Sequence, residues 1–424
     1  MQNKSCSDWN TAMEHTVRTR RLKLIIAFIT MLAAGIIYAW SIINAPFMLV
    51  SDGVILNAAE LGINYTLTIV FFCIGGFCAG VISKQTSTAL RLILSALMVF
   101  ASFFSSSLLV VTLHDSGNYF LLYLSYGMLG GLGIGMAYVT VITAINAWYP
   151  DRRGFASGVM LMGFGLSLLI IGRVADILGK SEAVGWRNTY IIIAISIAAV
   201  LFVSALFIKY PPPETEFPTP KSGKKERINE EPADYTTSQM IRRPSFILVF
   251  IYITILAALG NAAIGFAKDI LLDVGSTENL AVTAVGMLGL FNGLGRLISG
   301  WLFDRLGIKQ TQLISSVISI LAPLMIVAAI TVSSSILGLL GLCLCGFSFG
   351  FAPTTSSVLT SEFYGAKNFP LNFSIMNLIL IPAPFAAMLA GNIKSSTGEF
   401  MQAFLILAAL TVVGFFINMA IRKP

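Results

Sequence analysis

The chain has 424 residues, of which 56% are hydrophobic and only 11% are charged, and its mean hydropathy is +0.83. A water-soluble domain of this size carries charge on roughly a quarter of its residues, so this composition excludes a soluble globule. The net charge of +7 does not indicate a nucleic-acid-binding protein either, because the basic residues are distributed among the loops between apolar runs.

Few residues in the chain are suited to metal or imidazole chemistry. The two histidines, His15 and His114, lie outside the apolar runs, and the five cysteines include no CxxC pair. Four of the cysteines lie within apolar segments, where we interpret them as small hydrophobic residues rather than disulfide partners or metal ligands. We therefore expect no metal site and no cofactor.

Twelve apolar runs are long enough to cross a bilayer, which takes about 20 residues in a helix. Helices are the expected spanning element because each backbone polar group must then find its partner within its own segment. The first run follows a basic stretch, but it is too long for a signal peptide and lacks an A-x-A cleavage site, so we expect it to remain in the protein. The runs are 24–50, 61–82, 90–113, 119–147, 154–178, 188–208, 245–267, 281–303, 311–331, 335–360, 369–392 and 400–421.

The basic residues are distributed unevenly between the two sides of the predicted bundle. With the N-terminus inside, 21 of the 27 lysines and arginines fall on its side, and Arg173 and Arg296 fall within the runs. Because cytoplasmic loops carry the excess of Lys and Arg, we predict a multi-pass protein of the cell membrane with both termini in the cytoplasm. The four on the opposite side are Lys180, Arg187, Lys268 and Lys394.

A polar stretch divides the twelve runs into six and six. Residues 209–244 are rich in Pro, Lys and Glu and have no apolar periodicity, so we interpret them as a cytoplasmic linker with room for one short amphipathic helix. The predicted organisation is a cytoplasmic tail (1–23), a first six-helix bundle (24–208), the linker and a second six-helix bundle (245–421).

The two halves resemble each other in sequence. Residues 131–150 align with 346–365 without a gap, and residues 71–80 align with 291–300. Internal duplication across twelve spans is typical of alternating-access carriers, which bind their substrate near the membrane midplane between the two halves. We therefore predict an all-α membrane protein with twelve transmembrane helices in two pseudo-symmetric six-helix bundles.

The loop after the eighth run strengthens this prediction. Residues 300–309, GWLFDRLGIK, resemble the GxLxDRxGxK loop signature of the major facilitator superfamily, whereas the counterpart after the second run, GVISKQ at 80–85, has lost the acid and most of the pattern. In that family the loop is a cytoplasmic gate and structural latch. The resemblance implies a major facilitator fold, and it favours a structural role over substrate binding for Asp304 and Arg305.

Arg296 is the charged residue that we expect deepest in the membrane. It lies eight residues before Asp304, or about 12 Å along a helix. A guanidinium at that depth costs about 2.5–3.5 kcal/mol on insertion scales, and it cannot avoid this cost by losing its proton. Asp176 lies near the outer end of the fifth run and has Arg173 as a closer helical neighbour. The pattern therefore favours a transported anion over an interhelical ion pair, and the guanidinium fork suits the two oxygens of a carboxylate.

Four more residues are candidates for the substrate site. Asn292 precedes Arg296 by one helical turn, so it shares the same face and could orient the guanidinium or a substrate oxygen. Tyr38 and Trp40 in the first run and Tyr138 in the fourth are candidate pocket walls, although lipid contact or core packing explains each of them equally well. The two tyrosines are favoured slightly because a hydroxyl needs a partner at depth.

Several segments together resemble the oxalate:formate antiporter family, microbial relatives of the monocarboxylate transporters within the major facilitator superfamily. The resemblance implies small carboxylate substrates and an anion-binding role for Arg296. The loop after the fourth run also contributes Arg152 and Arg153, which we group with Asp304 and Arg305 as gating-loop residues. The segments are GIIYAWS at 35–41 with Pro46, GLGIGMAYVT at 131–140, WYPDRRGFASG at 148–158 and FNGLGR at 291–296.

Two departures from this family affect the expected substrate. Oxalate carriers of the family place a lysine in helix eleven, whereas residues 369–392 contain no basic residue, so a monoanion fits better than a dianion. Monocarboxylate transporters of the animal type carry an acid four residues before the arginine, where this chain has Asn292. Pro382 and Pro384 should bend the eleventh helix, which would serve gating or only packing.

We therefore predict a secondary transporter of a small monocarboxylate, such as formate, lactate or pyruvate, working by alternating access as an antiporter or proton symporter. The alternatives are an antiporter of oxalate or another dicarboxylate, and a carrier of another organic anion or drug. An enzyme or nucleotide-driven pump is not expected, because the spans contain no catalytic constellation and the chain has no P-loop. The expected partners are the substrate, the lipid bilayer and either protons or a counter-anion, with the chain acting as a monomer.

Overall fold

The part of the chain that the structure describes is mainly helical and contains no strand. Much of the predicted linker, 218–233, lies outside this part, as do residues 1–5 of the predicted tail and 49–50 at the end of the first run. The side chains of His15 and His114 are not described either. The computed structural model describes residues 6–48, 58–116, 119–215, 217 and 234–424.

Twelve of the described helices are long and apolar enough to cross a membrane, as the sequence predicts. The helix that carries the first span already begins at Cys6, well before the predicted limit at residue 24. The helix continues through this stretch because Arg, Lys and Leu favour helical backbone even when they do not face lipid. The spans are Thr16–Phe47, Leu61–Lys84, Thr88–Val110, Phe120–Trp148, Arg153–Lys180, Gly185–Phe207, Pro244–Asp273, Glu278–Leu306, Ile308–Thr331, Ser335–Tyr364, Phe369–Thr397 and Met401–Ala420.

The chain folds into two compact units, Met1–Glu230 (unit 1) and Glu231–Pro424 (unit 2), and each contains six of the spans. The boundary between them lies inside the stretch 209–244. The end of that stretch forms a five-residue helix with a capping box, in which Thr236 and Gln239 bond each other's backbone.

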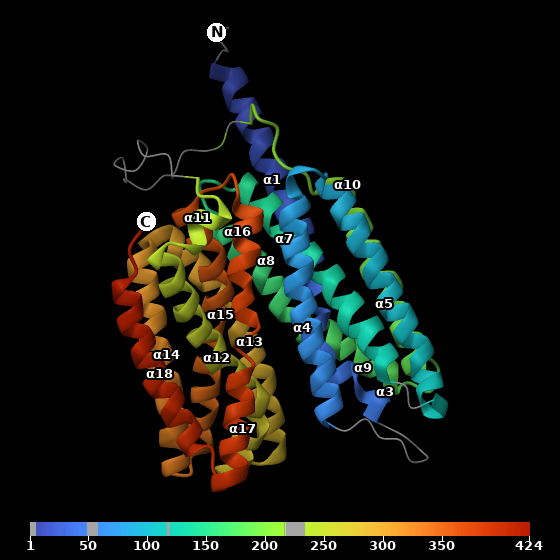
Figure 1. Ribbon diagram of the computed structural model, residues 1–424, viewed down its shortest axis with the longest axis vertical. Coiled ribbons are helices and arrows are strands. Elements are labelled where there is room, and N and C mark those ends of the chain that lie inside the picture. The colour runs from blue at the N-terminus through green and yellow to red at the C-terminus, as the bar shows by residue number, and fades with distance from the viewer. Residues whose placement is uncertain (1–5, 49–57, 117–118, 216, 218–233) are drawn as a thin grey trace. The chain divides into compact units, whose positions relative to one another are not determined.

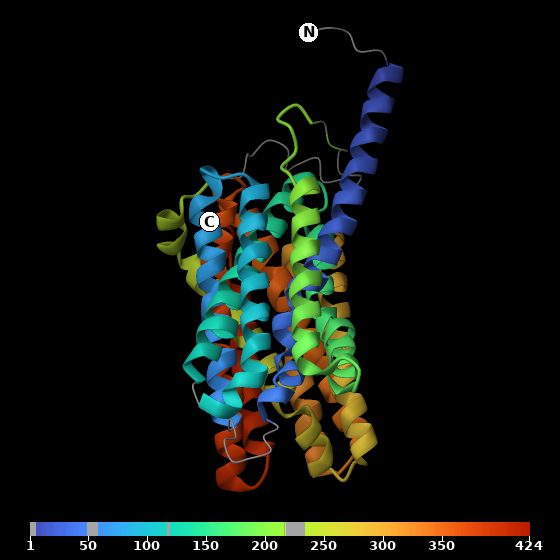
Figure 2. The ribbon, with the colours of Figure 1, turned by 90° about the vertical axis from the view of Figure 1, so that its right-hand side faces the viewer.

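Unit 1 contains spans one to six. Figures 1 and 2 show that α5 and α10 lie side by side in this unit, where they form the most extensive packing between two of its helices. Its elements are α1 (Cys6–Ala34), η1 (Gly35–Ala39), α2 (Trp40–Ile43), α3 (Ala45–Met48), α4 (Ala58–Val81), η2 (Ile82–Lys84), α5 (Thr88–Ser116), α6 (Tyr119–Leu122), η3 (Tyr123–Gly130), α7 (Gly131–Trp148), α8 (Arg153–Ser167), η4 (Leu168–Gly172), α9 (Arg173–Lys180) and α10 (Gly185–Phe207).

Unit 2 contains spans seven to twelve. Span ten, which is a single uninterrupted helix, packs on spans seven, eight and nine and forms the centre of the unit. Its elements are α11 (Thr237–Ile241), α12 (Pro244–Asp273), α13 (Glu278–Leu306), α14 (Ile308–Thr331), α15 (Ser335–Tyr364), α16 (Phe369–Met376), η6 (Asn377–Leu380), α17 (Phe385–Thr397) and α18 (Met401–Ala420).

Several spans are interrupted near their middle. In span eleven, α16 changes to a 3-10 segment at Asn377 and then to a turn, and a regular helix resumes at Phe385. This confirms the predicted bend, because Pro382 and Pro384 lack the N–H groups that a continuous helix would need. The sequence did not predict the non-helical backbone of Phe266 within α12, nor the π-helical segments η3 and η4.

In unit 1, spans two and four approach each other at glycines. A Cβ atom added to Gly135 would lie 1.9 Å from the carbonyl oxygen of Phe72, and one added to Gly131 would lie 2.5 Å from that of Thr68. No real side chain fits at such distances, so α4 and α7 pack backbone against backbone here.

Spans eight and ten of unit 2 approach each other in the same way. A Cβ atom on Gly350 would lie 2.5 Å from the carbonyl oxygen of Asn292, and one on Gly346 would lie 2.3 Å from that of Leu288. Gly350, Gly346 and Asn292 are the aligned counterparts of Gly135, Gly131 and Phe72, and Leu288 stands at the same offset from Thr68, so the sequence similarity between the halves corresponds to a shared packing of helix pairs.

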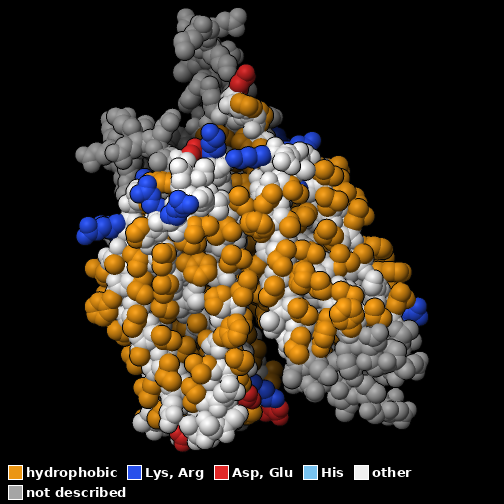
Figure 3. All heavy atoms as spheres, in the orientation of Figure 1, with side chains coloured by type: hydrophobic (Ala, Val, Ile, Leu, Met, Phe, Trp, Pro, Cys, Tyr) orange, Lys and Arg blue, Asp and Glu red, His pale blue; other side chains and the backbone are white. Residues whose placement is uncertain are grey.

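The outward faces of both units are apolar. In the view of Figure 3, hydrophobic side chains cover the lateral face of each unit, and most of the Lys and Arg side chains in view on unit 2 lie at the end formed by α11 and the start of α16. Leu, Ile and Phe side chains along the spans are about half exposed, for example Ile195 and Phe416. A surface of this kind is stable in lipid rather than in water.

Candidate functional site

Arg296 lies almost completely inside unit 2. Its relative exposure is 1%, and its Nε donates a hydrogen bond to Oδ1 of Asn292 over 3.2 Å. The two side chains therefore share one face of α13 in direct contact, as their spacing of one helical turn predicts. This contact fixes the orientation of the guanidinium plane, because Nε lies in that plane.

The backbone at Arg296 is also fixed by span ten. The hydroxyl of Thr354 donates to the carbonyl oxygen of Arg296 over 3.2 Å, and Ser299 donates to the same oxygen over 3.0 Å. A Cβ atom on Gly350 would lie 2.7 Å from the backbone nitrogen of Arg296. Span ten therefore packs directly against the turn of α13 that carries the cation.

A hydroxyl-rich stretch of α15 extends this buried polar region. Residues 354–357 are Thr-Thr-Ser-Ser, and all four are buried. Ser356 donates to Oδ1 of Asn377 over 3.4 Å, at the residue where the regular helix of span eleven ends. These residues are not among the site residues predicted from the sequence, although a run of four hydroxyl side chains in an apolar helix was a usable signal.

In unit 1, the two predicted tyrosines contact the same aromatic ring. The rings of Tyr38 and Tyr138 lie 5.3 Å and 5.1 Å from that of Phe164, and Phe72 lies 5.1 Å from Tyr138. Tyr38 lies in the 3-10 segment η1, which interrupts the helix of span one. These residues form an aromatic cluster of unit 1, defined here as Tyr38, Phe72, Tyr138 and Phe164.

Trp40 belongs to a different cluster. Its indole N–H donates to the carbonyl oxygen of Leu61 over 3.0 Å, and its ring lies 4.4 Å from Tyr126. Trp40 has an exposure of 4% and connects span one to the start of span two. Thus the structure brings Tyr38 and Tyr138 together and places Trp40 apart from them.

The loop after span four is held by an acid–base contact that the sequence did not single out. Arg20 of α1 forms an ion pair with Asp151 at 2.7 Å, and its guanidinium lies 4.8 Å from the centre of the Tyr149 ring. Burial raises the pKa of Tyr149 to about 12, although Arg20 acts in the opposite direction. The predicted gating residue Arg152 is exposed and lies 3.9 Å from the second oxygen of Asp151. The more buried Arg20 is therefore the closer partner of this acid.

The corresponding loop of unit 2 lies between α13 and α14. Arg305 is exposed, and its guanidinium lies 4.9 Å from the ring centre of Trp301, while Asp304 is half-buried. Gly307 has a φ of 82°, which a glycine adopts without strain, and it both ends α13 and begins α14. The glycine of the loop signature therefore makes the tight turn between the two spans.

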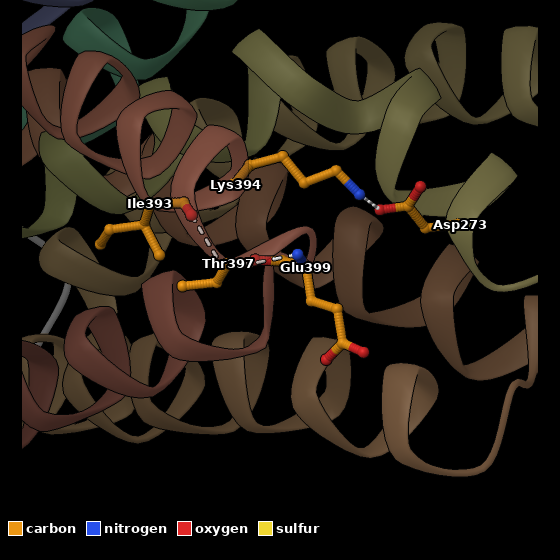
Figure 4. Close-up of polar contacts among 5 residues, drawn as sticks. All are labelled: Asp273, Ile393, Lys394, Thr397 and Glu399. Atoms are coloured by element: carbon orange, nitrogen blue, oxygen red, sulfur yellow. Dashed lines mark hydrogen bonds and ion pairs between the residues drawn. The ribbon is translucent and has the colours of Figure 1, made fainter.

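At the other end of unit 2, two polar contacts hold the second half of span eleven (Figure 4). Lys394 forms an ion pair with Asp273 at the end of α12. The hydroxyl of Thr397 donates to the carbonyl oxygens of Ile393 and Glu399 at the end of α17. Lys394, the first basic residue of span eleven, therefore has an acidic partner at the end of the span.

The charged residues at the C-terminal end of span five pair as their helical spacing predicts. Asp176 lies 3.6 Å from Arg173 and 2.7 Å from Lys180, both on the same short helix. Arg173 is largely exposed, with 73% of its side chain accessible. Among the described residues, no group of three or more His, Cys, Asp or Glu side chains could hold a metal ion.

Twelve apolar helices in two units with matching helix-pair contacts, together with an arginine buried within a span of unit 2, define a polytopic carrier of the kind that moves solutes across membranes. The model of the Major Facilitator Superfamily matches residues 24–381, and the chain belongs to this superfamily. It is therefore a multi-pass secondary transporter of the membrane rather than an enzyme.

Relatives and solved structures agree with this assignment. The uncharacterized MFS-type transporter YhjX of Escherichia coli is 27% identical over 366 residues, which cover 85% of each chain. The oxalate:formate antiporter of Oxalobacter formigenes is 24% identical over 398 residues, which cover 92% of this chain and 89% of that one. The crystal structure of the superfamily transporter FucP in the outward conformation aligns with a TM-score of 0.69 at 14% identity and covers 96% of this chain and all of that one.

Proposed function

We propose that this transporter carries a small monocarboxylate anion, such as formate, lactate or pyruvate, and that Arg296 binds the carboxylate. The observation that carries the proposal is the almost complete burial of Arg296 in direct contact with Asn292. A guanidinium keeps its charge at every relevant pH, so its position inside a membrane helix has to be compensated by polar groups or an anion.

The geometry of a guanidinium also fits the ligand. Its parallel N–H groups bind the two oxygens of a carboxylate with a specificity that an ammonium lacks. The hydrogen bond from Nε to Asn292 fixes the plane of the Arg296 guanidinium. The hydroxyl groups of Thr354 and Ser299 bond the backbone carbonyl oxygen of the same residue. We infer that this support fixes the cation for binding, since a rigid fork loses less entropy when it captures its ligand.

The charge of span eleven favours a monoanion. From Phe369 to Asn392 it has no Lys or Arg, and Lys394 is engaged by Asp273 at the end of the unit. A single fixed cation therefore remains for the substrate in this region, which suits formate better than oxalate. The similarity to an oxalate:formate antiporter supports both anions, and transport of oxalate or another dicarboxylate is the second candidate function.

The coupling mode belongs to the same proposal. Asn292 stands where animal monocarboxylate transporters carry an acid, so we infer that this position takes up no proton, and that transport is either antiport or symport with a proton carried by another route. We also propose that the basic ends of the units face the cytoplasm, following the excess of Lys and Arg there.

The test is uptake into liposomes by the purified protein, with labelled formate, lactate, pyruvate and oxalate, with and without a pH gradient. Arg296→Gln should abolish carboxylate uptake without loss of folded protein, because removing the charge also removes its insertion cost. Arg296→Lys should weaken transport because the fork is lost. Exchange of external substrate for internal formate without a pH gradient would identify antiport.

The matched control is Arg173→Gln, which removes an exposed arginine from span five and should leave uptake unchanged. Normal carboxylate uptake by a folded Arg296→Gln variant would contradict the proposal. Uptake of oxalate in preference to every monocarboxylate would favour the second candidate.

A further inference from the structure

A second arginine is buried in unit 1, apart from the residues considered so far. Arg91 lies in the first turn of α5 and has a relative exposure of 0%. In the sequence it counts among the basic residues on the N-terminal side of the membrane, but the structure encloses it between helices. Its counterpart in the unit 2 repeat is Thr311, so the shared architecture does not itself require a cation at this position.

The guanidinium of Arg91 is only partly bonded. Its Nε donates to the carbonyl oxygen of Ser87 over 3.4 Å, which directs the group towards the N-terminal end of α5. Both Nη1 and Nη2 are enclosed and have no hydrogen-bond partner within the described part of the chain. The N-terminal end of a long helix carries partial positive charge, so it adds to the charge of the guanidinium instead of offsetting it.

A second unsatisfied donor lies at the same level of the helix pair. A Cβ atom on Gly133 of α7 would lie 3.1 Å from the carbonyl oxygen of Ser95, so α5 and α7 are in close contact there. Thr140 is two turns further along the same face of α7, and Arg91 is one turn before Ser95 on α5. Because the two spans run in opposite directions, both residues lie on the same side of this contact, Thr140 about 10 Å and Arg91 about 6 Å away along the helix axes. The bond of Arg91 Nε to the carbonyl oxygen of Ser87, one turn earlier, carries its guanidinium further in the same direction.

The hydroxyl of Thr140 is also buried and lacks a hydrogen-bond partner among the residues that the structure describes. The Nη groups of Arg91 on α5 and the hydroxyl of Thr140 on α7 are therefore buried donors without an acceptor from the described residues, at a similar height along the two helices. A water molecule would supply an acceptor, but it would not neutralise the guanidinium. Burying an uncompensated charge is strongly unfavourable, and arginine cannot avoid this by deprotonation.

We propose that Arg91 and Thr140 form a site for one small monoanion, of the size of chloride or formate, between α5 and α7. The anion neutralises the guanidinium, accepts hydrogen bonds from Nη1 or Nη2 and from the threonine hydroxyl, and stabilises the contact between spans three and four. Both side chains are fully enclosed, so the headgroup of a lipid cannot reach them and the proposed ligand is a small free anion. The site is separate from Arg296 and does not depend on the proposed substrate.

The test is the thermal unfolding of the purified transporter at constant ionic strength, with gluconate replaced stepwise by chloride. The titration is made in the Arg296→Gln background, so that a chloride ion at Arg296 cannot contribute. An anion that binds only the folded state should raise Tm along a saturable curve. A flat curve would overturn the proposal.

Two substitutions in this background locate the site. Arg91→Met keeps the apolar stem and removes the charge, and it should make Tm independent of chloride. Arg173→Gln is the matched control and should retain the full chloride effect. A chloride effect that persists in folded Arg91→Met protein would contradict the assignment to this arginine.

Thr140→Val provides a test that does not require the arginine variant to fold. It keeps the shape and the charge but removes one hydrogen bond, so the chloride concentration for half of the effect should rise about 3- to 10-fold. An unchanged midpoint in Thr140→Val would exclude the threonine and overturn the site as proposed.

Discussion

Spans two and four of unit 1 and spans eight and ten of unit 2 have the same close backbone contacts. The side chains next to these contacts are apolar in unit 1, whereas in unit 2 they are polar and charged. Gly135 and Gly350 bring each pair together at aligned positions. On the partner helix, unit 1 has Phe72, whereas unit 2 has Asn292 with Arg296 one turn later. The position aligned with Arg296 is Gly76.

This difference shows how duplicated halves can acquire different roles. The contact between the helix backbones depends on small residues, so it can be kept while neighbouring side chains change. In unit 1 those side chains form the aromatic cluster of Tyr38, Phe72, Tyr138 and Phe164, and in unit 2 they include a buried cation and its orienting amide. In our proposal the transported carboxylate binds in unit 2, and the aromatic cluster of unit 1 is structural.

The largest effect should come from breaking the shared contact itself. Gly135→Ala and Gly350→Ala each place a Cβ atom within 2.5 Å of a carbonyl oxygen on the partner helix. We expect each substitution to lower the free energy of unfolding by about 1–3 kcal/mol through overpacking, with the greater loss for Gly135→Ala, where the distance is 1.9 Å. Thermal unfolding in detergent measures the change.

The two alanine variants should differ in transport. Gly350→Ala displaces the turn that carries Arg296, so carboxylate affinity should fall, whereas Gly135→Ala should affect the amount of folded protein more than affinity. Gly62→Ala and Gly286→Ala are matched controls on α4 and α13, because an added Cβ meets nothing within 4 Å at either position. Equal affinity losses in both test variants would show that the two helix pairs do not differ as proposed.

Much of the fold could be predicted from the sequence because hydropathy acts locally. Each span needs about 20 apolar residues whatever its neighbours are, so the twelve spans follow from composition along the chain. The bend in span eleven was predictable in the same way from Pro382 and Pro384. The non-helical backbone at Phe266 was not predicted, because no proline lies near it in α12.

The candidate site was predictable only where its partners share a helix. Asn292 and Arg296 are one turn apart, so their contact follows from helical geometry. The contact between Arg20 and Asp151 joins residues 131 positions apart, and the enclosure of Arg91 depends on how α5 packs on α7 and α10. Such contacts depend on tertiary packing, which no local pattern specifies.

A smaller effect is expected from the residue that orients the cation. Asn292→Leu removes the hydrogen bond to Nε but keeps the charge of Arg296, so KM for the carboxylate should rise by about tenfold, as for loss of one bond to a charged group. Phe72→Leu, at the aligned position of unit 1, should leave KM unchanged. Initial uptake rates in liposomes measure both. An unchanged KM in Asn292→Leu would show that the amide of Asn292 is not needed to orient the guanidinium of Arg296.

The smallest effect should follow from Tyr138→Phe, which removes one hydroxyl from the aromatic cluster of unit 1. If this cluster serves packing, KM should stay within about threefold of the original value, because ring contacts at 5.1 Å to Phe72 and Phe164 are retained. A rise in KM of tenfold or more would instead indicate a hydrogen bond from this hydroxyl to the substrate. Unit 1 would then take part in binding, and the contrast with unit 2 would be one of charge alone.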